Sequence, residues 1–234
     1  MAGGEGRRFR PLSLYIAKSM IPIGKYEKPL LEYVIRNMKQ SGINDVYILV
    51  KHKKHQIINY FNDGSRFGVK IRYVEDPADK VGNGAAILNL LRKMKITCGT
   101  LLIYYGDIVT TLNLSKVVEY HREKNADVTI VVSKYRAPVG IIKYDRRSGR
   151  VRDIAEKPLL GISASIGVLA SEVEVLRKAF PLFSKFKSID FMADILPYLL
   201  ARGAKIYAYN FRGFWYDVGS LEKYEKLKLP KSFR

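Results

Sequence analysis

The chain has 234 residues, of which 47% are hydrophobic and 12% are aromatic, a composition that suits one large folded domain and argues against a disordered chain. Its 41 Lys and Arg residues against 22 Asp and Glu residues leave a formal net charge of +19, which attracts anions such as nucleic acid, anionic lipid and phosphorylated metabolites. The one cysteine, Cys98, excludes an internal disulfide and a multi-cysteine zinc site.

No apolar run reaches the roughly 18 residues that a membrane helix needs. The glycine-rich, basic N-terminus lacks the apolar segment of a signal peptide, so we expect a cytoplasmic protein without a membrane partner. The basic residues are scattered and no nucleic-acid-binding motif is recognisable, which makes nucleic acid the less favoured anion. We expect His52, His55 and His121 to lie on the surface, because their neighbours in the sequence are polar.

Strand-like and helix-like segments alternate along the first half of the chain. A helix over 28–41 ends at Gly42, and its apolar stripe consists of Leu30, Leu31, Val34, Ile35 and Met38. The elements that follow are a strand over 45–50, a short helix around 57–61, a strand over 69–74, a helix over 84–94, a strand over 101–105, a helix over 114–124 and a strand over 128–132. This alternation predicts an α/β fold with a mixed, mostly parallel sheet flanked by helices.

From about residue 137 the strand candidates become shorter and are separated by turns. We expect strands over 139–144, 151–154 and 166–169, helices around 171–180 and 190–201, a strand over 205–209 and a helix over 220–228. No linker, repeat or low-complexity stretch interrupts the chain. The sequence therefore predicts a single domain over 1–234 with two parts, about 1–136 and about 137–234.

A glycine-rich, basic segment, GGEGRRFRP from Gly3 to Pro11, is the first candidate site, and Lys18 follows it. Glycine allows backbone N–H groups to approach a phosphate, arginine matches phosphate oxygens with a planar fork, and lysine supplies a mobile charge. A glycine-rich loop alone is weak evidence, and a flexible basic terminus is the alternative. The dense basic cluster directly after the glycines favours a phosphate site.

Further motifs follow this loop in a fixed order. They are Lys28-Pro29-Leu30-Leu31-Glu32-Tyr33, Val81 to Ile87 (VGNGAAI), Gly106-Asp107, Val139-Gly140, Glu156-Lys157-Pro158 and Trp215 to Gly219 (WYDVG). Together the motifs resemble those of the sugar-1-phosphate nucleotidyltransferases, also called nucleotide-sugar pyrophosphorylases, along the whole chain. The resemblance implies the Rossmann-like nucleotide-diphospho-sugar transferase fold, with a nucleotide-binding part over about 1–136 and a sugar-binding part over about 137–234.

The resemblance implies that a nucleotidyl group passes from a nucleoside triphosphate to a sugar 1-phosphate by an Mg²⁺-dependent in-line displacement that releases pyrophosphate. The catalytic residues that it implies are Arg8, Lys18, Asp107 and Lys157. The nucleotide-binding residues are Gly3, Gly4, Gly6, Gly82 and Asn83, and the sugar-phosphate-binding residues are Gly140, Glu156, Lys157 and Ser163. The Mg²⁺ ligands are Asp107 and Asp217, in keeping with the few carboxylates that Mg²⁺ takes beside phosphates and water.

Each motif also has an interpretation without a ligand. Gly106-Asp107 taken alone is an ordinary strand-end turn, Glu156-Lys157 is an exposed ion pair of little energetic worth, and Asp217 or Ser220 is a helix cap. A nucleic-acid-binding module and a non-catalytic regulatory homologue are the rival functions. The retained charged residues argue against the regulatory homologue.

The chain departs from the family pattern in two places. Ser163 to Gly167 (SASIG) stands where the family carries N-x-G-I, which keeps phosphocholine or another phosphorylated alcohol open as the acceptor. The family also carries an apolar strand before its glycine loop, whereas Met1 lies inside the loop motif. We therefore expect the first strand to be missing from this sequence.

The sequence leaves the nucleotide and the sugar open. Gly82-Asn83-Gly84 leans toward guanylyl transfer, with uridylyl, thymidylyl and cytidylyl transfer as alternatives. A homo-oligomer is one of the assemblies that the sequence allows. The abundance of Lys, Arg, Ile and Tyr is typical of thermophiles, although composition is weak evidence on this point.

Overall fold

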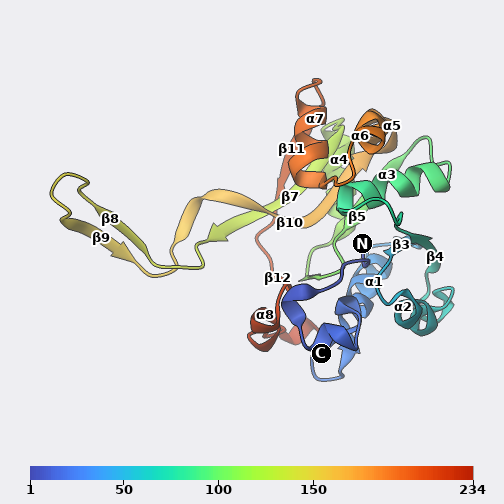
Figure 1. The fold of residues 1–234 in the computed structure, drawn as a ribbon, viewed down its shortest axis with the longest axis horizontal. Helices are drawn as coiled ribbons and strands as arrows, with labels where there is room; N and C mark the ends of the chain where they lie inside the picture. The colour runs from blue at the N-terminus through green and yellow to red at the C-terminus, as the bar shows by residue number, and fades with distance from the viewer. Residues whose placement is uncertain (234) are drawn as a thin grey trace.

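The computed structural model describes residues 1–233 and places the main sheets between two layers of helices (Figure 1). A four-stranded sheet has the order β11-β7-β10-β5, and a two-stranded sheet holds β3 and β4. The strands of these two sheets are β3 (Asp45–Val50), β4 (Lys70–Glu75), β5 (Thr100–Tyr104), β7 (Val128–Arg136), β10 (Leu159–Glu172) and β11 (Ile206–Asn210). Three short ladders complete the strands: β1 (Pro22–Ile23) with β2 (Lys28–Pro29), β6 (Ile108–Thr110) with β12 (Trp215–Asp217), and β8 (Ile141–Tyr144) with β9 (Val151–Ala155).

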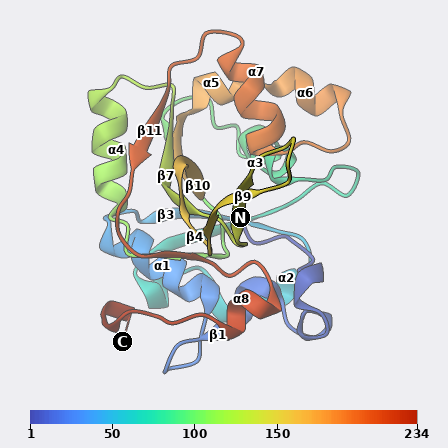
Figure 2. The same ribbon diagram turned by 90° about the vertical axis from the view of Figure 1, so that its left-hand side faces the viewer.

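Helices cover both faces of the sheets (Figure 2). One face packs against α3 (Asn83–Lys93), α5 (Val173–Arg177), α6 (Phe180–Lys185), a π-helix (Phe191–Ile195) and α7 (Leu196–Leu200). The opposite face packs against α1 (Leu30–Gln40), α2 (Lys54–Phe61) and α4 (Leu114–Glu123). The last α-helix, α8 (Leu221–Glu225), lies next to a third apolar cluster around Phe9 and Val218.

The helical segments form where apolar periodicity and caps agree. In α1 the predicted stripe is buried from Leu30 to Ile35, and Met38 packs against the core. Helix α4 is capped by Asn113, whose side chain accepts hydrogen bonds from the N–H groups of Ser115 and Lys116. The expected helix around 171–180 is instead two short helices, because the chain turns between α5 and α6 at Lys178 and Ala179.

The expectation of a mostly parallel sheet is wrong. Only β3 with β4 and β11 with β7 are parallel, whereas β10 runs antiparallel to both β5 and β7. The cause is the long chain reversal between β7 and β10, which returns through a hairpin rather than a crossover helix. The fold is a mixed α/β arrangement in which β10 lies between β5 and β7.

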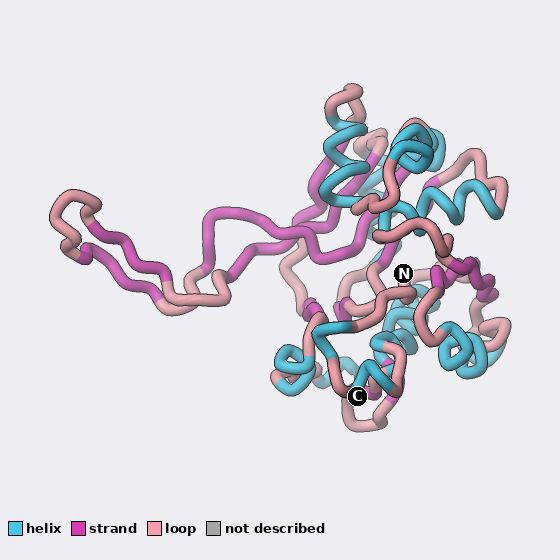
Figure 3. The backbone as a smooth tube through the Cα atoms, in the orientation of Figure 1, coloured by secondary structure: helices cyan, strands magenta, loops and turns pink. Residues whose placement is uncertain are grey.

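The hairpin β8–β9 forms an arm that projects far from the body of the molecule (Figures 1 and 3). Its tip is fixed by Asp145, whose Oδ1 accepts hydrogen bonds from the N–H groups of Arg147 at 3.0 Å and Ser148 at 2.9 Å. Of the described helices, none is long and apolar enough to cross a membrane.

The prediction of a surface position is wrong for His121. This side chain is buried on α4, where Nδ1 lies 2.8 Å from the Thr129 hydroxyl and Nε2 lies 2.9 Å from Oε1 of Glu172. Its sequence neighbours are polar because they lie on other sides of the helix. The one buried histidine thus joins α4 to β7 and β10 through two hydrogen bonds.

Candidate active site

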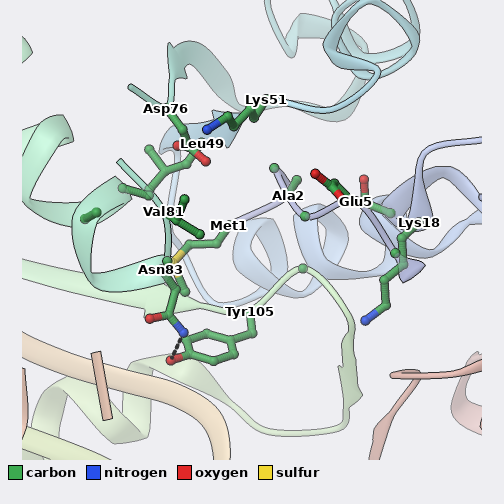
Figure 4. Close-up of a pocket in the computed structure, with 18 of the residues that line it drawn as sticks. Met1, Ala2, Glu5, Lys18, Leu49, Lys51, Asp76, Val81, Asn83 and Tyr105 are labelled. Atoms are coloured by element: carbon green, nitrogen blue, oxygen red, sulfur yellow. Dashed lines mark hydrogen bonds between the residues drawn. The ribbon is translucent and has the colours of Figure 1, made fainter. Parts of the chain in front are cut away.

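A cleft of about 580 Å³ opens where β3, β4 and β5 end (Figure 4). The residues that follow these strands, Lys51, Asp76 and Tyr105 to Asp107, line it together with the N-terminal loop and the start of α3. In α/β proteins ligands bind outside the carboxyl ends of the strands. The cleft therefore lies at the position where α/β proteins bind their ligands.

The glycine-rich loop forms one wall of the cleft, with Gly3, Gly4 and Gly6 among the lining residues. Gly6 has φ 65°, in the left-handed region that glycine adopts without strain. A Cβ added to Gly4 would meet no heavy atom within 4 Å, so the loop presents open backbone at this point. Arg7 lines the cleft, whereas Arg8 is exposed and is not among the lining residues.

Lys18 and Asp107 meet in the same cleft. The Nζ atom of Lys18 donates a hydrogen bond of 2.5 Å to Oδ2 of Asp107, and the two side chains are 16% and 28% exposed. Lys18 begins a short 3₁₀ helix, and Asp107 stands between β5 and β6. A partly buried ion pair that still faces an open cleft can exchange partners when a phosphate arrives.

Asp217 lies beside Asp107 across the β6–β12 ladder, although it is not among the residues that line the cleft. The N–H group of Val218 donates to the carbonyl oxygen of Asp107 at 2.8 Å, and Asp217 stands opposite Ile108. Lys223 Nζ donates to Oδ2 of Asp217 at 2.5 Å. The cap of α8 is Ser220, the alternative that the sequence allowed.

The two aspartates fit a magnesium ion that also takes phosphate oxygens. Within residues 1–233 no group of three or more His, Cys, Asp and Glu side chains could hold a metal ion. Mg²⁺ usually binds one or two carboxylates and completes its shell with water and substrate phosphates. Asp107 and Asp217, each paired with a lysine, match that donor set.

Gly82 and Asn83 line the cleft, and each has a structural role there. Gly82 has φ +100°, and a Cβ on it would lie 2.2 Å from the carbonyl oxygen of Ile189. The Asn83 amide donates to the Tyr105 hydroxyl at 3.1 Å, as Figure 4 shows, and its oxygen accepts from the N–H group of Phe191 at 2.6 Å. Both residues thus join the cleft wall to the loop before the π-helix.

Three charged residues that line the cleft outside the N-terminal loop were missed by the sequence analysis: Lys51, Asp76 and Lys80. The first two directly follow β3 and β4, so the strand-end rule that singled out Asp107 could have found them. Burial raises the pKa of the Asp76 carboxyl group to about 6, and its Oδ1 atom has no hydrogen-bond partner. Lys51 Nζ donates to the carbonyl oxygens of Pro77 at 3.0 Å and Lys80 at 3.2 Å, which fixes the loop after β4.

The expected sugar-side residues lie outside this cleft, at the base of the arm. Gly140 packs against Glu156, since a Cβ on it would lie 2.9 Å from Oε2 of Glu156. Glu156 and Lys157 form an exposed ion pair of 3.5 Å, and Lys157 has φ 44°, a strained value for a residue with a Cβ. Ser163 lies on β10, paired with Lys134 of β7.

The comparison with protein families decides the classification: the nucleotidyl transferase family matches residues 1–230. The chain belongs to this family. Among similar proteins, a UTP–glucose-1-phosphate uridylyltransferase of Synechocystis is 30% identical over 96% of the chain and 60% of its own length. A glucose-1-phosphate adenylyltransferase of Mycoplasma mobile is 32% identical over 98% of the chain and 65% of its own length.

Solved structures of this family share the fold. A putative glucose-1-phosphate thymidylyltransferase from Bacillus anthracis, in complex with sucrose, has a TM-score of 0.75 at 20% identity, with 99% of this chain and 96% of that chain covered. A UDP-glucose pyrophosphorylase complexed with UDP-glucose has a TM-score of 0.72 at 22% identity, with 96% and 94% covered. The chain thus spans nearly all of these structures but only 60 to 65% of the length of the two relatives above.

Proposed function

We propose that this nucleotidyl transferase family member joins a nucleoside triphosphate to a sugar 1-phosphate and releases pyrophosphate. The observation that carries the proposal is the Lys18–Asp107 pair, which faces the glycine-rich loop across a cleft at the strand ends. The division of the chain into a nucleotide part over 1–136 and a sugar part over 137–234 belongs to the same proposal.

The reaction needs positioning and charge neutralisation rather than a covalent intermediate. A phosphate oxygen of the sugar phosphate attacks the α-phosphorus, a new P–O bond forms, and the bond to the departing pyrophosphate breaks. Backbone N–H groups of Gly3, Gly4 and Gly6 bind the triphosphate, and Lys18 leaves Asp107 to stabilise the charge that develops on the phosphates. Arg7 and the exposed Arg8 attract the triphosphate to the loop.

Magnesium, where bound, neutralises phosphate charge and orients the reacting groups. Asp107 and Asp217 would hold it, since they are neighbours across one ladder and offer two carboxylates. Release of Lys18 and Lys223 from these carboxylates would accompany binding.

The base of the arm is proposed to hold the acceptor through Gly140, Glu156, Lys157 and Ser163. Lys157 is an exposed cation there, with its Nζ atom 3.5 Å from Oε1 of Glu156. An exposed cationic side chain suits an acceptor phosphate.

Glucose 1-phosphate is the first acceptor to test, because the two relatives and the putative thymidylyltransferase all carry it in their names. Those names contain uridylyl, adenylyl and thymidylyl transfer, so all nucleoside triphosphates belong in the assay. GTP is included because the Gly82-Asn83-Gly84 pattern leans toward guanylyl transfer.

The test is pyrophosphate release, with each nucleoside triphosphate crossed against glucose, mannose and glucosamine 1-phosphates and phosphocholine, with and without Mg²⁺. We expect release only with one pair of substrates and Mg²⁺. Lys18→Ala should lower kcat/KM by about 10² to 10³, the cost of removing one charged group that stabilises the transition state. Lys116→Ala, an exposed change on α4, is the control and should keep full activity. Silence of the well-folded protein across the grid would reject the proposal.

A further inference from the structure

The arm and its base, residues 138–165, bury no side chain of their own. They consist of the β8–β9 hairpin and the outer part of β10, and they project from the body of the molecule (Figures 1 and 3). No residue of this range is buried, whereas Ala137 and Ile166 on either side of it are 3% and 1% exposed. A two-stranded hairpin without a second layer is marginally stable in water. The arm therefore lacks a packing partner within this chain.

Large apolar side chains are concentrated in the same range. Of the eighteen that are exposed among the described residues, seven lie between residues 139 and 162. They are each 50–70% exposed and comprise Val139, Ile142, Tyr144, Val151, Ile154, Leu159 and Ile162. Single exposed apolar residues are ordinary on a protein surface, but a contiguous group of them marks an interaction site.

The pairing of β8 with β9 gathers four of these side chains on one face of the arm. Ile142 stands opposite Ile154, and Tyr144 stands opposite Val151. Cross-strand partners share a face, and Ile142 shares one with Tyr144 because side chains alternate along a strand. The register shift between Lys143 and Tyr144 lets Val151 and Ile154, three residues apart, reach this face together. We name these four side chains the apolar stripe.

The charged side chains of the arm lie away from the apolar stripe. Lys143 stands opposite Asp153 on the other face, with 3.0 Å between Nζ and Oδ2. Arg146, Arg147 and Arg150 are exposed at the tip. A partner that recognises charge, such as a nucleic acid or an acidic protein, would bind the tip and leave the stripe uncovered. The surface that needs a partner is apolar and uncharged.

A second copy of this chain suits the apolar stripe. Two-fold symmetry brings the same patch of both copies together, so one uncharged stripe would pack against another. If the two arms run antiparallel, their basic tips lie at opposite ends, separated by about the 14–17 Å that β8 and β9 span. This exceeds the Debye length of about 8 Å at physiological ionic strength. Residues 138–165 also match the roughly 20–30 residues that each side of a standard interface takes.

We infer that the apolar stripe is a dimer interface, in which the arms of two copies pack face to face and antiparallel. Each arm then supplies the second layer that the other lacks, as two sheets do in a sandwich. The ion pair of Lys143 and Asp153 stays on the outer face of each arm. The dimer also fixes the base of the arm, which nothing in the single chain covers.

The experiment measures the oligomeric state of the full chain by sedimentation velocity, without substrate, from about 1 to 100 µM protein. The test variant carries Ile142→Ser and Ile154→Ser, which remove one cross-strand pair from the apolar stripe. The matched control carries Lys143→Ser and Asp153→Ser, which remove the neighbouring cross-strand pair from the other face. All four side chains are exposed, so the body of the molecule should fold in both variants, and an unchanged Tm checks this.

We expect the wild type to dimerise, and we expect the stripe variant to raise the dimer Kd at least about 100-fold. The control should change Kd by less than about threefold, because an exposed ion pair contributes little. A wild type that stays monomeric at the highest concentration would overturn the inference. A dimer that both variants weaken equally, or that neither weakens, would overturn it as well.

Thiol labelling locates the interface independently of these variants. Cys98 is exposed and is the only cysteine in the chain, so Cys98→Ser gives a background without thiols. On this background, Val151→Cys should react more slowly with a maleimide as the protein concentration rises, whereas Lys143→Cys should react at a constant rate. Protection of position 143 without protection of position 151 would contradict the face-to-face arrangement.

A last readout rests on the proposed function. If the base of the arm holds the acceptor, the stripe variant should raise the KM for the sugar 1-phosphate and leave the KM for the nucleotide unchanged. The sedimentation result needs no substrate and is therefore independent of activity. Loss of the dimer without a change in either KM would support the interface and count against an acceptor site at the base of the arm.

Discussion

Replacing Gly82 by alanine should destabilise the protein strongly, although the change adds only one methyl group. The residue has φ +100° and ψ 155° at the start of α3, a conformation that is confined almost entirely to glycine and costs other residues about 1–3 kcal/mol. The added Cβ would also lie 2.2 Å from the carbonyl oxygen of Ile189, so the backbone must move. Overpacking of this kind costs about 1–3 kcal/mol more.

The two contributions together give a loss of about 2–6 kcal/mol in the free energy of unfolding. For a chain of this size, that corresponds to a fall in Tm of at least about 4 °C. Thermal unfolding followed by circular dichroism measures it directly. The physical reason is close approach of two backbones, since the N–H group of Gly84 also donates to Ile189 at 3.0 Å.

Gly4→Ala is the matched control from the same cleft. No heavy atom lies within 4 Å of its added Cβ, so its Tm should change by less than about 2 °C. If the loop binds the triphosphate, the methyl group should instead raise the KM for the nucleotide. A Gly82→Ala protein as stable as the wild type, or a Gly4→Ala protein that loses stability equally, would refute the reasoning.

Three further perturbations test the site and the core. Burial raises the pKa of Asp76 to about 6, so the carboxyl group contributes stability at low pH, and this contribution is lost as the pH rises from about 4 to 6. Replacing Asp76 by asparagine should therefore raise Tm near pH 7.5 and leave Tm unchanged near pH 4. Lys223→Ala removes the partner of Asp217 and should lower the Mg²⁺ concentration for half-maximal pyrophosphate release; a higher requirement would contradict the proposed metal site. His121→Ala should cost about 2–4 kcal/mol by chemical denaturation, because it empties a buried site and leaves two hydrogen-bond partners unpaired. His55 is exposed, so His55→Ala should lower the free energy of unfolding by less than about 0.5 kcal/mol. An equal loss in the His121→Ala and His55→Ala proteins would show that the buried hydrogen bonds of His121 do not stabilise the fold.

The candidate site could be predicted in part because its residues lie directly after strands or at the first residues of helices. Lys18 and Asp107, which are 89 residues apart in the sequence, do meet in one cleft with the glycines of the N-terminal loop. The sequence placed Glu156 and Lys157 in a separate sugar-side group, and it did not predict that a hairpin between β7 and β10 would hold them outside this cleft.

The sequence by itself determined the local elements, because apolar periodicity, caps and glycine conformations act over a few residues. Helix α1 and strand β3 lie close to their expected positions for this reason. Only the tertiary structure decided how the strands pair, because the paired residues of β10 and β5 are 64 to 72 positions apart and are joined by backbone hydrogen bonds that carry no side-chain signature. The burial of His121 likewise depends on which elements pack together, which no short stretch of sequence encodes.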